Sequence, residues 1–152
     1  MKKNTTHPPF PSLPHLQVRA WLWDVRYGGE YPPFAFAAAN VDAYFEFVAL
    51  AAEATDPDYG YGTVGTEVDP AKIPTPDHLA EGRISHVFWL NVWPEAVVDR
   101  LGRERVLSAP AWRVRELATG GVLVVAADNP SSPTDAWVTG RADVAAHLGL
   151  EY

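Results

Sequence analysis

The chain contains no cysteine and is poor in positive charge. Without cysteine, neither a disulfide framework nor a thiolate metal site can form, and thiol nucleophiles are excluded. The 152 residues carry 12 lysines and arginines against 19 aspartates and glutamates, a formal net charge of -7. Such a surface repels phosphate backbones, so direct binding to nucleic acid or to an anionic membrane is not expected. A basic protein would be attracted to it.

The sequence also lacks a long apolar run. No stretch approaches the ~20 apolar residues that a membrane-spanning helix needs, and residues 1–10 run into prolines where a signal peptide would have its apolar core. We therefore expect a cytoplasmic protein. Apolar residues still make up 47% of the chain, enough for one buried core, and we predict a single domain over residues 16–152. Residues 1–15 are predicted to form a proline-rich lead.

The strongest local pattern lies at residues 84–93. Apolar side chains occupy both faces of this segment if the chain is extended. A strand of this kind is typical of the middle of a sheet that is covered on both sides. Pro94 suits the first position of a helix and Gly102 suits its end, so the pattern predicts a central strand that leads directly into a short helix.

The remaining patterns complete an α+β order. Alternating apolar residues predict a strand at 16–27, and apolar residues at helical spacing predict an amphipathic helix at 41–54. Residues 112–117 and 122–127 flank a glycine-containing turn, which predicts a β-hairpin. A last short helix is predicted at 139–148. The fold class that follows is α+β, a single domain with a mainly antiparallel sheet and two to three helices packed on it.

The sequence contains no recognisable catalytic grouping. Its five histidines are scattered, without the spacing of a zinc site, and no serine lies in a nucleophile elbow. His86 lies among apolar neighbours, which favours a hydrogen-bonded structural histidine over a catalytic one. We therefore expect no enzyme activity, no cofactor and no metal.

Residues 53–81 form an acidic segment in which Lys72 is the one basic residue. Glycine and proline interrupt any regular period there, apart from a short strand predicted at 63–68. Tyrosines accompany the carboxylates, and tyrosine is a common contact residue in protein interfaces because it buries a large rigid area at little entropic cost. This combination favours a binding surface, with acid–base chemistry by a carboxylate pair as the alternative. The predicted contact residues are Asp56, Asp58, Tyr59, Tyr61, Glu67 and Asp69.

Arginines gather in the second half of the chain. We expect them to be solvated side chains on a helix edge and a strand face, with pairing to the acidic segment as the alternative. The cluster consists of Arg100, Arg103, Arg105, Arg113 and Arg115.

Residues 84–127 resemble bacterial immunity proteins of polymorphic-toxin and type VI secretion systems, and the helix at 41–54 resembles them loosely. The motifs that carry the resemblance are Phe88-Trp89-Leu90-Asn91, Pro94-Glu95-Ala96-Val97-Val98, Leu101-Gly102-Arg103-Glu104, Leu107-Ser108-Ala109-Pro110-Ala111 and Gly120-Gly121-Val122-Leu123. The resemblance implies a small cytoplasmic protein, without turnover of its own, that neutralises a cognate antibacterial toxin by covering its active surface.

The charge balance suits a toxin with a basic surface, such as a nuclease. A membrane-acting or NAD-cleaving toxin would also be compatible. Two other functions remain open at this point. One is a small hydrolase-like enzyme that uses the carboxylates of the acidic segment, and the other is a secretion adaptor or chaperone.

Overall fold

The computed structural model describes residues 35–62, 69–128 and 135–150. These residues form an α+β fold with a four-stranded antiparallel sheet and five α-helices, three of which have seven or more residues, so the predicted fold class is confirmed. The elements follow in the order α1 (Ala35–Thr55), β1 (Gly60–Gly62), 3-10 helix η1 (Pro70–Lys72), α2 (Pro76–Ala80), β2 (Leu90–Trp93), α3 (Glu95–Leu101), α4 (Arg103–Leu107), β3 (Arg113–Glu116), β4 (Val122–Val125) and α5 (Asp135–Leu148).

The sheet has the strand order β1-β2-β4-β3, and every neighbouring pair is antiparallel. In the central pair, Leu90 lies opposite Val125 and Trp93 lies opposite Val122. All residues of β2 and β4 are buried. The predicted hairpin is present as β3 and β4, which places β3 at one edge of the described sheet and β1 at the other.

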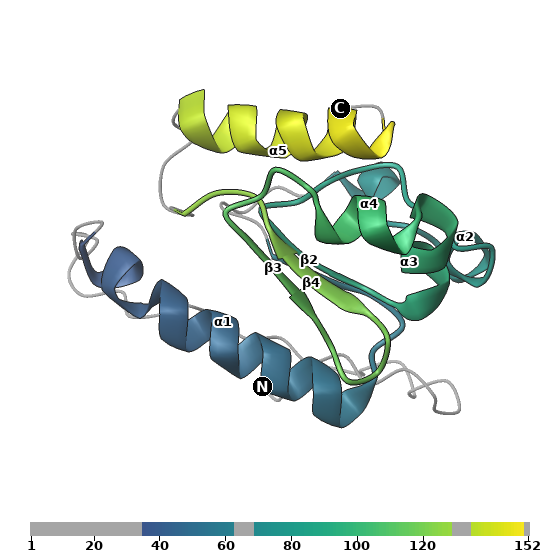
Figure 1. Ribbon diagram of the computed structural model, residues 1–152, viewed down its shortest axis with the longest axis horizontal. Helices are drawn as coiled ribbons and strands as arrows, with labels where there is room; N and C mark the ends of the chain where they lie inside the picture. Colours follow the sequence, from purple (N-terminus) through teal and green to yellow (C-terminus); the bar gives the residue numbers. More distant parts are fainter. Residues whose placement is uncertain (1–34, 63–68, 129–134, 151–152) are drawn as a thin grey trace, which may run out of the picture.

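Helices cover both faces of the sheet (Figure 1). α1 lies along one face, while α3, α4 and α5 lie on the other. The first face buries Phe45, Ala49, Ala52, Trp89, Leu90, Val92, Leu117, Leu123, Val125 and Ala127. The second buries Val87, Trp93, Val97, Val98, Val106, Ala109, Val122, Val124, Ala126, Val144, Ala145 and Leu148. The expectation that the central strand is apolar on both faces is therefore confirmed.

The regular part of the central strand is shorter than the predicted segment at 84–93. Residues from His86 onward are buried, but the ladder begins only at Leu90. The reason lies in the Asn91 side chain, whose Oδ1 accepts from the Phe88 N–H at 2.9 Å and whose Nδ2 donates to the Phe88 carbonyl at 2.8 Å. Because a side chain satisfies both backbone groups of Phe88, that residue does not pair with a neighbouring strand.

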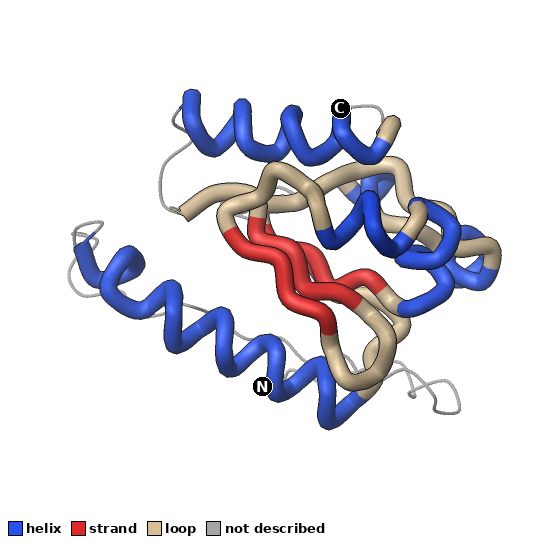
Figure 2. The backbone as a smooth tube through the Cα atoms, viewed as in Figure 1, coloured by secondary structure: helices blue, strands red, loops and turns tan. Residues whose placement is uncertain are grey.

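Figure 2 shows the helices in blue, and two of their boundaries differ from the predicted ones. α1 begins at Ala35 instead of residue 41, because the alanine-rich stretch before Asn40 favours helix strongly. Pro94 is extended, with φ -68° and ψ 164°, and therefore precedes the first helical residue of α3. Its carbonyl accepts from the N–H groups of Val97 and Val98. Gly102, at φ 90°, separates α3 from α4.

Some predicted elements lie outside the described residues. They are the lead at 1–15 and the strands at 16–27 and 63–68. The last predicted helix is confirmed as α5, which begins a few residues earlier than residue 139. None of the helices in the described ranges is long and apolar enough to cross a membrane.

Candidate functional site

The connection from α1 into β1 brings aromatic side chains of two distant segments together. The ring centroids of Tyr59 and Tyr61 lie 6.1 Å apart, and those of Tyr61 and Phe88 lie 4.6 Å apart. Phe88 in turn contacts His86 edge to face, at 4.8 Å. We call these four residues the aromatic row. Tilted and edge-to-face pairs of this kind each contribute about 0.5–1.5 kcal/mol beyond burial, so the row is held in a defined arrangement.

Members of the aromatic row differ sharply in exposure. Phe88 and His86 are buried, whereas Tyr61 is 39% exposed. Tyr59 is partly buried against the core, and its buried hydroxyl has no hydrogen-bond partner among the residues that the structure describes. Burial is the main cause that raises the pKa of Tyr59, and the adjacent Tyr61 adds to it. Tyr61 is therefore the most exposed member of the row.

Glycines fix the position of Tyr61 on the sheet. A Cβ atom on Gly60 would lie 2.9 Å from the Cβ of Val92, and one on Gly62 would lie 3.1 Å from the Cβ of Leu90. A side chain at residue 60 would therefore force β1 and β2 to shift, and one at residue 62 would need Leu90 to give by a few tenths of an ångström. The Gly-Tyr-Gly sequence thus forms a strand at the edge of the described sheet, with one tyrosine at its centre.

Two of the predicted acidic contact residues, Asp56 and Asp58, lie just before this strand in the chain. Asp56 follows α1 directly with φ 44°, a left-handed conformation that aspartate tolerates, and its N–H donates to the Ala52 carbonyl at 2.9 Å. Asp58 is exposed two residues before β1. Asp69 caps η1, because its Oδ1 accepts from the Ala71 N–H at 2.9 Å.

Four of the six predicted residues, Asp56, Asp58, Tyr59 and Tyr61, lie within one stretch of six residues that reaches into β1, so their proximity follows from the sequence itself. Asp69 belongs to the opposite end of the aromatic row, since its charge acts on the imidazole of His86. Glu67 lies outside the described residues.

Sequence reasoning missed the partner of His86. Arg141 of α5 is only 8% exposed. Its Nε donates to the Val87 carbonyl at 2.9 Å, and its Nη2 lies 2.8 Å from Nε2 of His86. Burial, followed by the positive charges of Arg141 and Lys72, lowers the pKa of His86 to about 4, against a smaller opposing effect of Asp69. His86 is thus a hydrogen-bonded, neutral residue of the interior.

One sequence signal could have found Arg141. It precedes Val144, Ala145 and Leu148 by three, four and seven residues, the spacing of one helix face. All three of these residues are buried. An arginine on such a face must either reach the surface or find acceptors inside, and Arg141 does the latter.

The clustered arginines bind carboxylates and carbonyls of neighbouring elements. Arg113 pairs with Asp42 of α1, and Arg115 pairs with Glu46 of α1 at 2.7 Å. Arg103 pairs with Glu116 of β3 at 2.6 Å. The expected solvated role is therefore only part of their role, because these side chains also connect α1 and α4 to the hairpin. Arg115 also lies 3.6 Å from Glu53 of the acidic segment, the pairing named above as the alternative. Each exposed pair contributes at most about 1 kcal/mol.

In the described part of the chain, neither a metal cluster nor the pocket beside α2 coincides with the acidic residues around β1. Among residues 35–62, 69–128 and 135–150, no three histidine, aspartate or glutamate side chains gather so as to hold a metal ion. The lining of the pocket comes from α2, the loop after it, α3 and Leu150, and it includes none of the predicted contact residues. Compared with family models, curated proteins and solved structures, the chain matches none.

Proposed function

We propose that this chain is an immunity-type binding protein that neutralises a cognate antibacterial toxin in the cytoplasm by covering the toxin's active surface. The observation that carries the proposal is the exposed ring of Tyr61, which lies on an edge strand against the buried ring of Phe88. A tyrosine that is already fixed loses little conformational freedom on binding, so more of its contact energy contributes to affinity.

Charge supports the same surface. Asp56 and Asp58 are exposed on the turn that precedes Tyr61, and the whole chain carries a net charge of -7. Exposed carboxylates around an aromatic contact mainly raise the association rate with a basic partner, because they attract it before contact. A toxin with a basic cleft, such as a nuclease, fits this arrangement best.

The alternative enzyme would use the same carboxylates for acid–base chemistry. Such a site needs a concave pocket in which polar groups converge on the substrate. One pocket of the described residues is lined by His78, Arg83, Arg100 and their neighbours, and the acidic residues around β1 do not line it. Asp69 caps η1, and Asp56 and Asp58 lie in the turn before β1. These positions favour a role at the charged rim of an interface.

Co-expression with the product of the adjacent gene tests the proposal. We expect a stable complex in size-exclusion chromatography and rescue of growth when that product is toxic. A secretion adaptor would bind its client without blocking the client's activity, so an activity assay of the complex separates the two functions. If the adjacent product forms no complex and growth is not rescued, the proposal is wrong.

A tyrosine variant tests the surface. Tyr61→Ala is expected to weaken the complex by about 30-fold, the effect of losing an interface residue worth ~2 kcal/mol. Phe47→Ala is the matched control, because Phe47 is a 50% exposed aromatic residue on α1 outside the proposed surface. Equal effects of the two variants would mean that the toxin binds elsewhere.

A further inference from the structure

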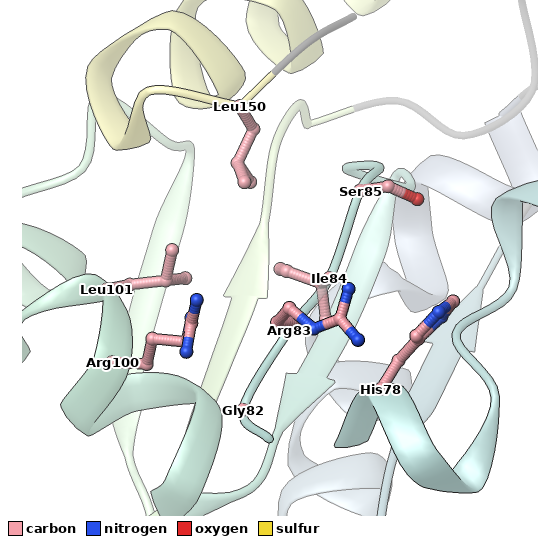
Figure 3. Close-up of a pocket in the computed structure, with 8 residues that line it drawn as sticks. All are labelled: His78, Gly82, Arg83, Ile84, Ser85, Arg100, Leu101 and Leu150. Atoms are coloured by element: carbon pink, nitrogen blue, oxygen red, sulfur yellow. The ribbon is translucent and has the colours of Figure 1, made fainter. Parts of the chain in front are cut away.

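A pocket of about 280 Å³ lies between α2, the loop that follows it, and α3. Figure 3 shows Arg83 between Arg100 of α3 on one side and His78 of α2 on the other. Ile84, Leu101 and Leu150 add apolar wall, and all three pack against the buried core. The pocket therefore combines cationic and donor groups with an apolar surface.

The two arginines retain unused hydrogen-bond donors. Arg83 donates through Nε to Glu81 Oε2 at 2.6 Å, and Arg100 donates through Nη1 to the Glu81 carbonyl at 3.2 Å. Within the described part of the chain, neither guanidinium makes another hydrogen bond or ion pair. Arg100 thus has no carboxylate partner there, unlike Arg103, Arg113 and Arg115.

His78 adds a third donor. Its Nδ1 accepts from the Thr75 N–H at 3.5 Å in the capping box that begins α2. With Nδ1 acting as acceptor, the hydrogen of the neutral ring lies on Nε2. The ring lies beside Arg83 in the pocket lining. Three side chains from two helices and a loop therefore supply donors to one small volume.

Gly82 brings these groups together. It has φ 65°, and a Cβ atom at this position would collide with the Ala96 carbonyl oxygen and lie 3.2 Å from the Cβ of Arg100. Only glycine allows the loop to approach α3 this closely. The approach places Arg83 and Arg100 in the lining of the same pocket, although the chain as a whole is acidic.

We propose that this pocket binds a small organic anion that has a carboxylate or phosphate group and an apolar part. The planar guanidinium of arginine can donate two hydrogen bonds to a carboxylate or to a phosphate. Arg83 and Arg100 have few protein acceptors, so their remaining donors can bind the same anion. The apolar part would lie against Ile84, Leu101 and Leu150. The volume limits the ligand to metabolite size, and the net charge of -7 opposes polyanions. This pocket shares no lining residue with the toxin-binding surface proposed around Tyr61.

Titration of the ¹⁵N-labelled full chain by NMR tests the site. The probes are hexanoate, inorganic phosphate and hexylammonium, the last having the same tail as hexanoate and the opposite charge. We expect saturable shifts of the amides of residues 82–85 and 100–101 with hexanoate or phosphate, and none with hexylammonium. Stronger binding of hexanoate would identify a carboxylate site with apolar selectivity, and stronger binding of phosphate would identify a phosphate site.

Charge variants separate a built site from general attraction. Arg100→Gln is expected to weaken binding about tenfold. Lys72→Gln removes the same charge from an exposed residue outside the pocket lining and is expected to leave binding unchanged. Glu81→Gln should strengthen binding, because it frees Arg83 from its partner. The proposal is overturned if neither anion gives saturable shifts, if hexylammonium shifts the same amides, or if Arg100→Gln and Lys72→Gln behave alike.

Discussion

The Nη2 atom of Arg141 lies 2.8 Å from Nε2 of His86, and both side chains are buried. A guanidinium has donors and no acceptor, so Nε2 of His86 must accept and the hydrogen of the ring must be on Nδ1. A second proton, on Nε2, would make the imidazole positive and place this charge beside the positive guanidinium of Arg141. The pair joins α5 to the segment that leads into the central strand, and it makes the fold dependent on an uncharged histidine.

Stability should therefore fall as the pH falls. The pKa of His86 is lowered from 6.5 to about 4 in the folded chain. Between these two pH values His86 binds a proton in the unfolded chain but not in the folded chain. Its contribution to the free energy of unfolding is therefore complete above about pH 6.5 and is lost as the pH falls toward 4. From pH 7 to pH 5 we expect a loss of about 2 kcal/mol from this residue alone. Urea unfolding at the two pH values measures it.

The control for this prediction is His86→Gln. The carbonyl of glutamine can accept from Arg141, but the side chain does not titrate. Carboxylates contribute equally to both proteins, so the difference between the two pH dependences isolates His86. If wild type and variant lose the same free energy of unfolding between pH 7 and pH 5, His86 is not the buried neutral acceptor described above.

Gly140→Ala should destabilise the fold although alanine favours helix. In an exposed helix this change stabilises by about 1 kcal/mol. Here a Cβ atom at residue 140 would lie 2.6 Å from the Ala126 carbonyl oxygen, so α5 must move away from the end of β4. We expect a net loss of about 1–3 kcal/mol in the free energy of unfolding.

Ala146→Gly is the matched control for helix propensity, because Ala146 is exposed on the same helix. It should cost about 1 kcal/mol. An increase in stability for Gly140→Ala, measured by urea unfolding, would show that α5 has room to accommodate a methyl group and that the close approach is not required.

Tyr59→Phe should leave the free energy of unfolding unchanged or raise it by up to about 1 kcal/mol. The Tyr59 hydroxyl is buried and finds no hydrogen-bond partner in residues 35–62, 69–128 and 135–150, and removing an unsatisfied polar group removes its desolvation cost. The control Tyr61→Phe alters a 39% exposed residue and should have almost no effect. A loss of stability specific to Tyr59→Phe would mean that the hydroxyl has a partner in the folded chain.

Local patterns predicted the centre of the fold well. The apolar run before Pro94, the helix that ends at Gly102 and the glycine turn of the hairpin each depend on neighbouring residues. The limits of the central strand could not be found in this way, because they depend on where the Asn91 side chain binds. The start of α1 differed because the alanines before residue 41 add helix propensity that the search for an amphipathic apolar stripe did not take into account.

The sequence predicted which residue types form the candidate site, but it did not predict the contacts between them. Acidic residues beside tyrosines indicated a surface around Asp58 and Tyr61, but the contact between Tyr61 and Phe88 arises from the pairing of β1 with β2. The Arg141–His86 contact likewise depends on packing between distant segments. So does the position of Arg83 and Arg100 in the lining of one pocket. The sequence shows which residue types are present, whereas the side chains that lie close together are determined by the sheet register and by the placement of the helices.

The central claim is that the β1 edge binds a toxin through Tyr61. Isothermal titration calorimetry of the adjacent gene product with wild type, Tyr61→Ala and Phe47→Ala tests it most directly. We predict tight binding by wild type and Phe47→Ala and about 30-fold weaker binding by Tyr61→Ala. Wild-type affinity in Tyr61→Ala, or no binding by any of the three proteins, would contradict the account.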